Sequence, residues 1–167
     1  RAYNYGVANA FQDAMAAVRH IVGHAREWGA NPDNIHYSGH SAGGHLALMC
    51  ASDPGMPMPR SVVGLAAAGV YIDGKTRLPQ MSAQIFQTAW GSDRSRWAQF
   101  SPHTHLNDRN GPKPQKVTLI QGRQDNQLDP NWAVNYVNAG LRAGWGTRLN
   151  MQQNGDHFSV ANPGRNQ

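Results

Sequence analysis

Cysteine, glutamate and long apolar runs are nearly absent from this sequence of 167 residues. Cys50 is the only cysteine, so the chain can form no internal disulfide and no zinc site built from cysteines. Glu27 is the only glutamate, and carboxylate chemistry therefore falls mostly on aspartate. No apolar run approaches the ~20 residues of a membrane span. The formal net charge is +5, but the basic residues are scattered. We therefore expect no membrane span, no metal or other cofactor, and no nucleic-acid partner.

The overall composition is that of a globular domain. Hydrophobic residues make up 40% of the chain and charged residues 15%, whereas a disordered chain combines few apolar residues with a high net charge. The first residue is Arg1 rather than methionine. The sequence therefore does not show whether a targeting segment exists. It predicts a soluble protein, and it gives no prediction of the compartment or the oligomeric state.

Apolar periodicity and turn residues divide the chain into alternating helices and strands. Strands are predicted over 35–39, 62–69, 117–121 and 147–152. Helices are predicted over 13–28, 42–51 and 83–90, and a fourth begins at Asp129-Pro130 and buries Trp132, Tyr136, Val137 and Leu141. The alternation predicts an α/β fold with a parallel sheet covered by helices on both faces. Residues 1–167 are assigned to one domain, which contains an irregular pocket or cap segment at about 73–114.

The strongest chemical signal is the pentapeptide Gly39-His40-Ser41-Ala42-Gly43, a match to G-x-S-x-G. A predicted strand precedes it and a helix of small residues follows it, which is the context that a nucleophile elbow requires. In such a turn the serine hydroxyl projects above the sheet, and the helix directs its N-terminus at the reacting carbonyl. Ser41 is thus the predicted nucleophile, and the backbone N–H of Ala42 is a predicted oxyanion donor.

A serine hydroxyl needs a base, and the base needs an acid that orients it. Asp125 follows the third predicted strand, so its carboxylate is expected at the edge of the sheet where Ser41 emerges. Asp129 is the rival, but Pro130 follows it directly and a helix starts there, so we assign it to capping. His157 lies in a glycine-containing loop after the last strand and is the predicted base. The chain order of serine, aspartate and histidine is that of the α/β-hydrolases.

The other histidines carry weaker signals. His20 and His24 are four residues apart on a helix, but no third ligand stands at a telling spacing, so no metal site is predicted. His40 lies inside the elbow and Tyr71 follows the second predicted strand. We name His40 and Tyr71 as candidate substrate-binding residues.

Several segments together carry a resemblance to a known family. Asn31-Pro32-Asp33-Asn34-Ile35 leads into Ser38-Gly39-His40-Ser41-Ala42-Gly43-Gly44-His45-Leu46-Ala47, and Gly69-Val70-Tyr71-Ile72-Asp73, Ser101-Pro102 and Asp156-His157-Phe158 follow later. The chain resembles the esterase/lipase group of α/β-hydrolases and is most similar there to carboxylesterases related to kynurenine formamidase. The likeness is specific at the elbow and loose from Lys75 to Asn110.

The resemblance implies an enzyme that hydrolyses a small-molecule ester or amide through an acyl-enzyme intermediate on Ser41, with His157 as base and Asp125 as acid. An arylformamidase or amidase, a peptidase, and a non-catalytic binding protein on the same fold stay open. The family sheet has eight strands, of which this chain is expected to hold the last four. The family's His-Gly-Gly oxyanion segment is not in the sequence. We therefore expect a C-terminal fragment that is weakly active or inactive alone, since one lost oxyanion donor costs ~10²–10³ in rate.

Overall fold

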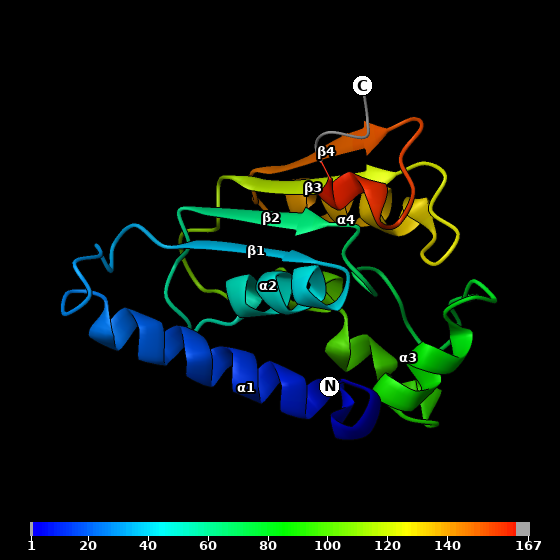
Figure 1. Ribbon diagram of the computed structural model, residues 1–167, viewed down its shortest axis with the longest axis horizontal. Coiled ribbons are helices and arrows are strands. Elements are labelled where there is room, and N and C mark those ends of the chain that lie inside the picture. Colours follow the sequence, from blue (N-terminus) through cyan, green and yellow to red (C-terminus); the bar gives the residue numbers. More distant parts are fainter. Residues whose placement is uncertain (1, 163–167) are drawn as a thin grey trace.

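The computed structural model describes residues 2–162 of the chain. Its strands are β1 (His36–His40), β2 (Ser61–Leu65), β3 (Val117–Gly122) and β4 (Thr147–Gln152). Its α-helices are α1 (Ala2–His24), α2 (Ala42–Ser52), α3 (Ala83–Trp90) and α4 (Pro130–Arg142). Three short 3₁₀ helices complete it: η1 (Arg94–Phe100), η2 (Pro102–His105) and η3 (Ser159–Ala161). Strands and helices alternate along the chain, as the sequence predicts (Figure 1).

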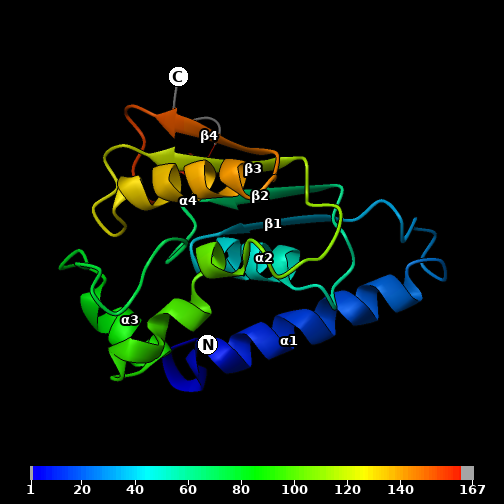
Figure 2. The same ribbon diagram turned by 180° about the vertical axis from the view of Figure 1, so that it is seen from behind.

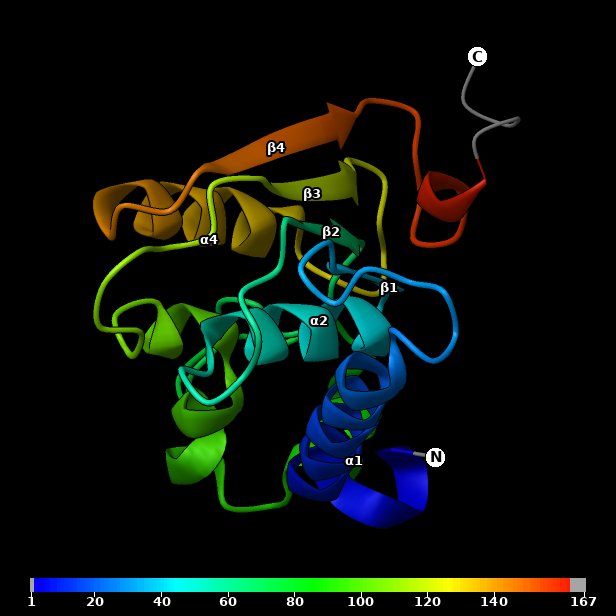
Figure 3. The same ribbon diagram turned by 90° about the vertical axis from the view of Figure 1, so that its left-hand side faces the viewer.

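The four strands form one parallel sheet in the order β1-β2-β3-β4. Side chains on one face of the sheet are buried, as in the row Tyr37, Val62, Val117 and Thr147. The next row faces the other way and is only partly buried or exposed: Ser38, Val63, Thr118 and Arg148. Helices α2 and α4 pack on the buried face, α2 against β1 and β2 and α4 against β3 and β4 (Figure 3).

The prediction of helices on both faces is therefore wrong for residues 2–162, although the parallel α/β architecture is confirmed. Burial alternates along β2 and along most of β3 instead of running continuously, which is the pattern of a sheet with one covered face. Figure 2 shows α4 and α2 on the same side of the strands, with α1 beyond α2. Helix α1 packs on α2 and α3.

The predicted boundaries of two elements are wrong for identifiable reasons. Helix α1 begins at Ala2 and contains a kink at Gly6, and it ends at His24 rather than at residue 28. Trp28 lies in the turn beyond it and is 58% exposed. Strand β2 stops at Leu65 because Ala66 has a φ of 41° and turns the chain away from the sheet.

Helix α4 begins where the sequence predicts. The side chain of Asp129 accepts a hydrogen bond from the Asn131 N–H at 2.9 Å, which is the predicted N-cap. Trp132, Tyr136 and Val137 are buried as predicted, whereas Leu141 is 56% exposed. Leu141 lies one residue before the end of the helix, next to the buried Gly140.

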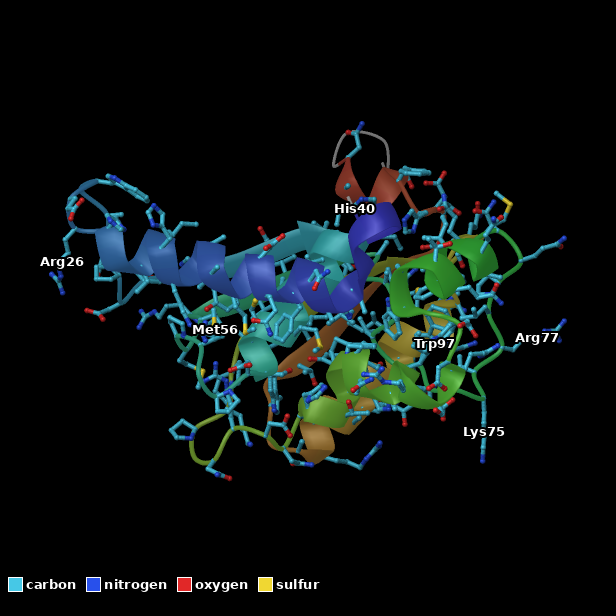
Figure 4. The ribbon with its side chains drawn as sticks, turned by 90° about the horizontal axis from the view of Figure 1, so that it is seen from below. Arg26, His40, Met56, Lys75, Arg77 and Trp97 are labelled. Carbon is cyan, nitrogen blue, oxygen red and sulfur yellow. The ribbon has the colours of Figure 1, made fainter. Side chains whose placement is uncertain are left out.

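The segment over 73–114 is irregular but firmly attached. Trp97 is completely buried, and the indole N–H of Trp145 donates to the Leu106 carbonyl at 2.8 Å. The guanidinium of Arg109 donates at 2.7 Å to the carbonyl of Ala51, in the last turn of α2, and at 2.9 Å to the carbonyl of Met56, beyond the end of that helix. In contrast, Lys75 and Arg77 point away from the molecule, as seen from below (Figure 4). Within residues 2–162, no helix has both the length and the apolar character needed to cross a membrane.

Candidate active site

Ser41 is the single residue between β1 and α2, and its backbone is strained. Its φ of 54° is a value that residues other than glycine rarely adopt. The surrounding backbone holds it there: the Ser41 N–H donates to the Leu65 carbonyl at 2.9 Å, and the Ser41 carbonyl accepts from the Ala68 N–H at 3.0 Å. A strand, one residue at positive φ and a helix follow one another here, which is the arrangement that the predicted nucleophile elbow requires.

The glycines around Ser41 have different reasons to be there. A Cβ atom on Gly39 would lie 2.2 Å from the Gly43 carbonyl carbon, and one on Gly44 would lie 2.9 Å from the Ala67 Cβ. A Cβ on Gly43 would meet nothing within 4 Å. The close approach that requires glycine therefore falls at 39 and 44, while Gly43 provides the backbone that Gly39 touches.

His157 lies within hydrogen-bonding distance of both Ser41 and Asp125, the two residues predicted to act with it. His157 Nε2 is 3.0 Å from Ser41 Oγ, and His157 Nδ1 is 2.9 Å from Asp125 Oδ2. The side chains of His157 and Asp125 are 5% and 0% exposed. An ionised carboxylate only accepts hydrogen bonds, so Nδ1 carries the proton and Nε2 presents its lone pair to the serine hydroxyl. In this state the imidazole can remove the Ser41 proton.

Asp125 is held by more groups than the sequence suggests. Its Oδ2 also accepts a hydrogen bond from the Gln121 amide at 3.0 Å, and its Oδ1 accepts from the backbone N–H groups of Gln127 and Leu128, both at 2.9 Å. Burial raises the pKa of the Asp125 carboxyl, but hydrogen bonds from His157, Leu128, Gln121 and Gln127 outweigh burial and leave that pKa below its ordinary value. Asp125 is therefore kept ionised beside His157.

Gln121 is a residue of this site that sequence reasoning missed. It is 2% exposed and lies near the end of β3. The signal was available, because an uncharged polar side chain stands where the alternation of β3 predicts a buried position. A buried polar side chain needs a hydrogen-bond partner, and the carboxylate that follows the strand supplies it.

The loop that carries His157 is built from local hydrogen bonds. Asp156 Oδ1 accepts from the backbone N–H groups of Phe158 and Ser159 at 2.9 and 2.7 Å. The Gly155 carbonyl accepts from the Gln124 N–H at 2.9 Å, which connects the loop of the base to the loop of the acid. A Cβ on Gly122 would lie 2.3 Å from that carbonyl, so glycine is required where the two loops meet.

An apolar cavity of about 370 Å³ lies beside Ser41 and His157. Helix α3 contributes its wall of Ile85, Phe86, Ala89 and Trp90, and α1 contributes Val7 and Ala10. Ala42 also lines it and is the first residue of α2, where a backbone N–H has no acceptor inside the helix. The Ala42 N–H thus lies at the helix terminus next to the nucleophile, as an oxyanion donor must.

The two candidate substrate-binding residues do not line this cavity. His40 Nε2 lies 2.7 Å from the carbonyl oxygen of His157. The Tyr71 ring stacks on His103, with ring centroids 4.2 Å apart. Their role toward substrate stays a prediction. Over residues 2–162, no three histidine, cysteine or acidic side chains are grouped so that they could hold a metal ion.

Comparisons with known proteins find one matching family model and several solved structures of similar fold. The model of a family described as BD-FAE matches residues 4–58, which includes the elbow. A structure of Thermogutta terrifontis esterase 2 phosphonylated by sarin has a TM-score of 0.75 and 22% identity, over 93% of this chain and 59% of that chain. The propionate-bound form of a Thermogutta terrifontis esterase has a TM-score of 0.72 and 25% identity, over 93% of this chain and 58% of that one. Among curated protein sequences, none matches.

The protein therefore has the fold of the α/β-hydrolases, as the sequence resemblance implies. The chain spans less than two thirds of the length of these solved esterases. Identities at this level establish the shared fold, and fold alone does not establish activity.

Proposed function

We propose that the protein is a serine hydrolase that cleaves carboxylic esters through an acyl-enzyme intermediate. The observation that carries this is the alignment of Ser41 Oγ, the His157 imidazole and the Asp125 carboxylate at 3.0 and 2.9 Å. The elbow and the BD-FAE match across it support the same reading.

The proposed reaction has two halves. Ser41 Oγ attacks the ester carbonyl while His157 Nε2 takes its proton, and the carbonyl oxygen gains negative charge next to the Ala42 N–H. His157 then returns the proton to the leaving alcohol, and the acyl group stays on Ser41. Water then attacks the acyl-enzyme while His157 takes its proton; the bond between the acyl carbon and Ser41 Oγ breaks, His157 returns the proton to Ser41 Oγ, and the acid is released. Asp125 keeps the imidazole in the tautomer that both halves need.

The cavity favours esters with an apolar group of modest size. Its wall from α3 and α1 is apolar, and within the described part of the chain no Lys, Arg, Asp or Glu side chain lines it. A charged acyl or alcohol group would lose its hydration there without gaining a partner, whereas an alkyl chain would gain from burial. The related esterase solved with butyrate bound is a protein of the same fold, and its ligand agrees with a small apolar acyl group.

The test combines active-site labelling with turnover. The protein, expressed at its full natural length, should react with a fluorophosphonate probe and hydrolyse p-nitrophenyl butyrate, and Ser41→Ala should abolish both while keeping the melting temperature. Preference for an N-formyl aromatic amide over the ester would change the substrate class to a formamidase, and cleavage of a peptide instead would indicate a peptidase. A folded protein that neither reacts with the probe nor turns over any of these substrates would be a binding protein on a hydrolase fold.

A further inference from the structure

The residue before the nucleophile makes a hydrogen bond that spans most of the chain. His40 is the last residue of β1, and its Nε2 lies 2.7 Å from the backbone carbonyl oxygen of His157, which is 117 residues later. A carbonyl oxygen can only accept, so His40 Nε2 carries a proton and donates it. The strand that holds the nucleophile is thereby bonded to the backbone of the base (Figure 4 shows His40 beside the end of the chain that carries η3).

A second backbone attachment of this loop lies on the side of Asp125. The Gly155 carbonyl accepts from Gln124, in the loop that also carries Asp125, and the turn at Asp156 is closed by its own neighbours. These bonds fix the loop relative to β3. They do not fix the distance between this loop and β1, the strand that Ser41 follows directly.

Apolar packing does little for the loop on that side. Phe158 follows the base and is 65% exposed. Its ring centroid lies 5.1 Å from that of His157 and 6.0 Å from that of His40, and the two imidazole centroids are 5.0 Å apart. The contact of these three rings is small: His157 is buried, His40 is partly buried and Phe158 is exposed. The hydrogen bond from His40 is the directional part of this contact.

We propose that His40 is a positioning residue: its imidazole N–H holds the His157 carbonyl and so keeps His157 Nε2 on Ser41 Oγ. This rests on the proposed serine-hydrolase function and adds a residue to it. Proton transfer needs donor and acceptor within about 3 Å. Without the bond the loop at 153–158 keeps its attachment to β3 but moves relative to β1, and the Ser41–His157 distance is no longer fixed.

The proposal differs from a role in binding substrate. His40 does not line the cavity, and its Nε2 is already occupied by the His157 carbonyl. A residue that binds substrate acts mainly on KM, whereas a residue that aligns the base acts on kcat and on the rate at which the serine is acylated.

The test compares three substitutions at His40 with a matched control. His40→Gln keeps a side-chain N–H of similar reach, His40→Phe keeps a ring but has no donor, and His40→Asn keeps an amide that is too short to reach the carbonyl. The control is His36→Phe, at the other end of β1 and exposed, where His36 Nδ1 lies 2.7 Å from the Ser61 hydroxyl. Each variant is checked for an unchanged melting temperature before kinetics.

We expect His40→Phe and His40→Asn to lower kcat for p-nitrophenyl butyrate, and the rate of fluorophosphonate labelling, by ~10- to 100-fold, because small displacements of a catalytic group cost that much. KM should stay within about threefold. His40→Gln and His36→Phe should stay within about threefold of the parent protein in every parameter. Amide hydrogen exchange over 153–160, measured by mass spectrometry, should become faster in the Phe and Asn variants alone.

Two results would overturn the proposal. One is an increase in KM with unchanged kcat and unchanged exchange, which would make His40 a substrate contact. The other is normal exchange and normal labelling in both the Phe and Asn variants. If the parent protein itself neither labels nor turns over, the proposed function fails, and hydrogen exchange alone then decides: faster exchange in the Phe and Asn variants keeps the tether, and unchanged exchange removes it.

Discussion

His45 makes the stability of this protein sensitive to mild acid. It lies in the first turns of α2, it is 3% exposed, and its Nε2 is 2.6 Å from the Phe100 carbonyl, to which it donates. Burial lowers the pKa of His45 from its ordinary 6.5 to about 4; the hydrogen bond to Phe100 opposes this, and the nearby His105 adds a smaller effect in the same direction. The folded protein therefore holds His45 in its neutral form.

The sign of the effect follows from where the proton binds. Well above pH 6.5 the His45 imidazole is neutral in both the folded and the unfolded protein, so pH does not change its contribution to the free energy of unfolding. Below 6.5 the unfolded chain binds a proton that the folded chain refuses until about pH 4, so the free energy of unfolding falls as pH falls. With these two values the loss between pH 7 and pH 4 is about 3 kcal/mol. That is a large part of the 5–15 kcal/mol typical of a native domain.

The assay is urea denaturation at pH 7, 6, 5 and 4, followed by tryptophan fluorescence, on the parent protein and His45→Gln. Glutamine keeps an N–H for the Phe100 carbonyl but does not titrate, and every other titrating group is common to both proteins. The difference between the two unfolding free energies should change by about 3 kcal/mol from pH 7 to pH 4, with the variant losing less. Parallel curves across this range would show that His45 is not the group responsible and that the reasoning from its burial is wrong.

Four further substitutions should have distinct effects. Asp125→Asn should leave the fold intact but lower kcat by about 10⁴-fold, because an amide favours the wrong imidazole tautomer; a loss below tenfold in steady-state assays would argue against this role. Gly39→Ala should lower the free energy of unfolding by about 3 kcal/mol or more in urea titrations, since its Cβ would lie 2.2 Å from the Gly43 backbone. In contrast, Gly23→Ala should raise it by ~0.5–1 kcal/mol, because Gly23 lies inside α1 and its Cβ would meet no described atom within 4 Å. Arg109→Met should cost ~2–5 kcal/mol, measured in the same way, because two buried carbonyls lose their donor; an unchanged midpoint would contradict this.

The elements that carry the site were predictable because each has a local signal. Ser41 stands in a pentapeptide whose first glycine, Gly39, is required by a close backbone contact. Asp125 follows a strongly apolar strand, and His157 follows a weaker one. In a parallel sheet the carboxyl ends of all strands lie at the same edge, so the sequence alone predicts that residues following different strands lie close together. Pro130 then separated Asp129 from Asp125 by marking a helix start.

What could not be predicted depends on long-range packing. Which face of the sheet is covered is decided by where α2 and α4 lie, and residue periodicity gives no position for a helix in space. Trp28 fits the apolar stripe of α1 but lies in the turn after it, because periodicity continues past the point where the backbone hydrogen bonds stop. The bond from His40 to the His157 carbonyl has no signal in the sequence, since any backbone carbonyl looks the same there.

The φ of 54° at Ser41 limits which side chains could serve as the proposed nucleophile. Threonine has the same hydroxyl chemistry, but its branched Cβ makes a positive φ a severe outlier. Cysteine has no such branch and should be accepted by the turn. We therefore expect Ser41→Cys to keep the backbone of the turn although sulfur replaces the hydroxyl oxygen. Ser41→Thr keeps the hydroxyl but is expected to distort the turn.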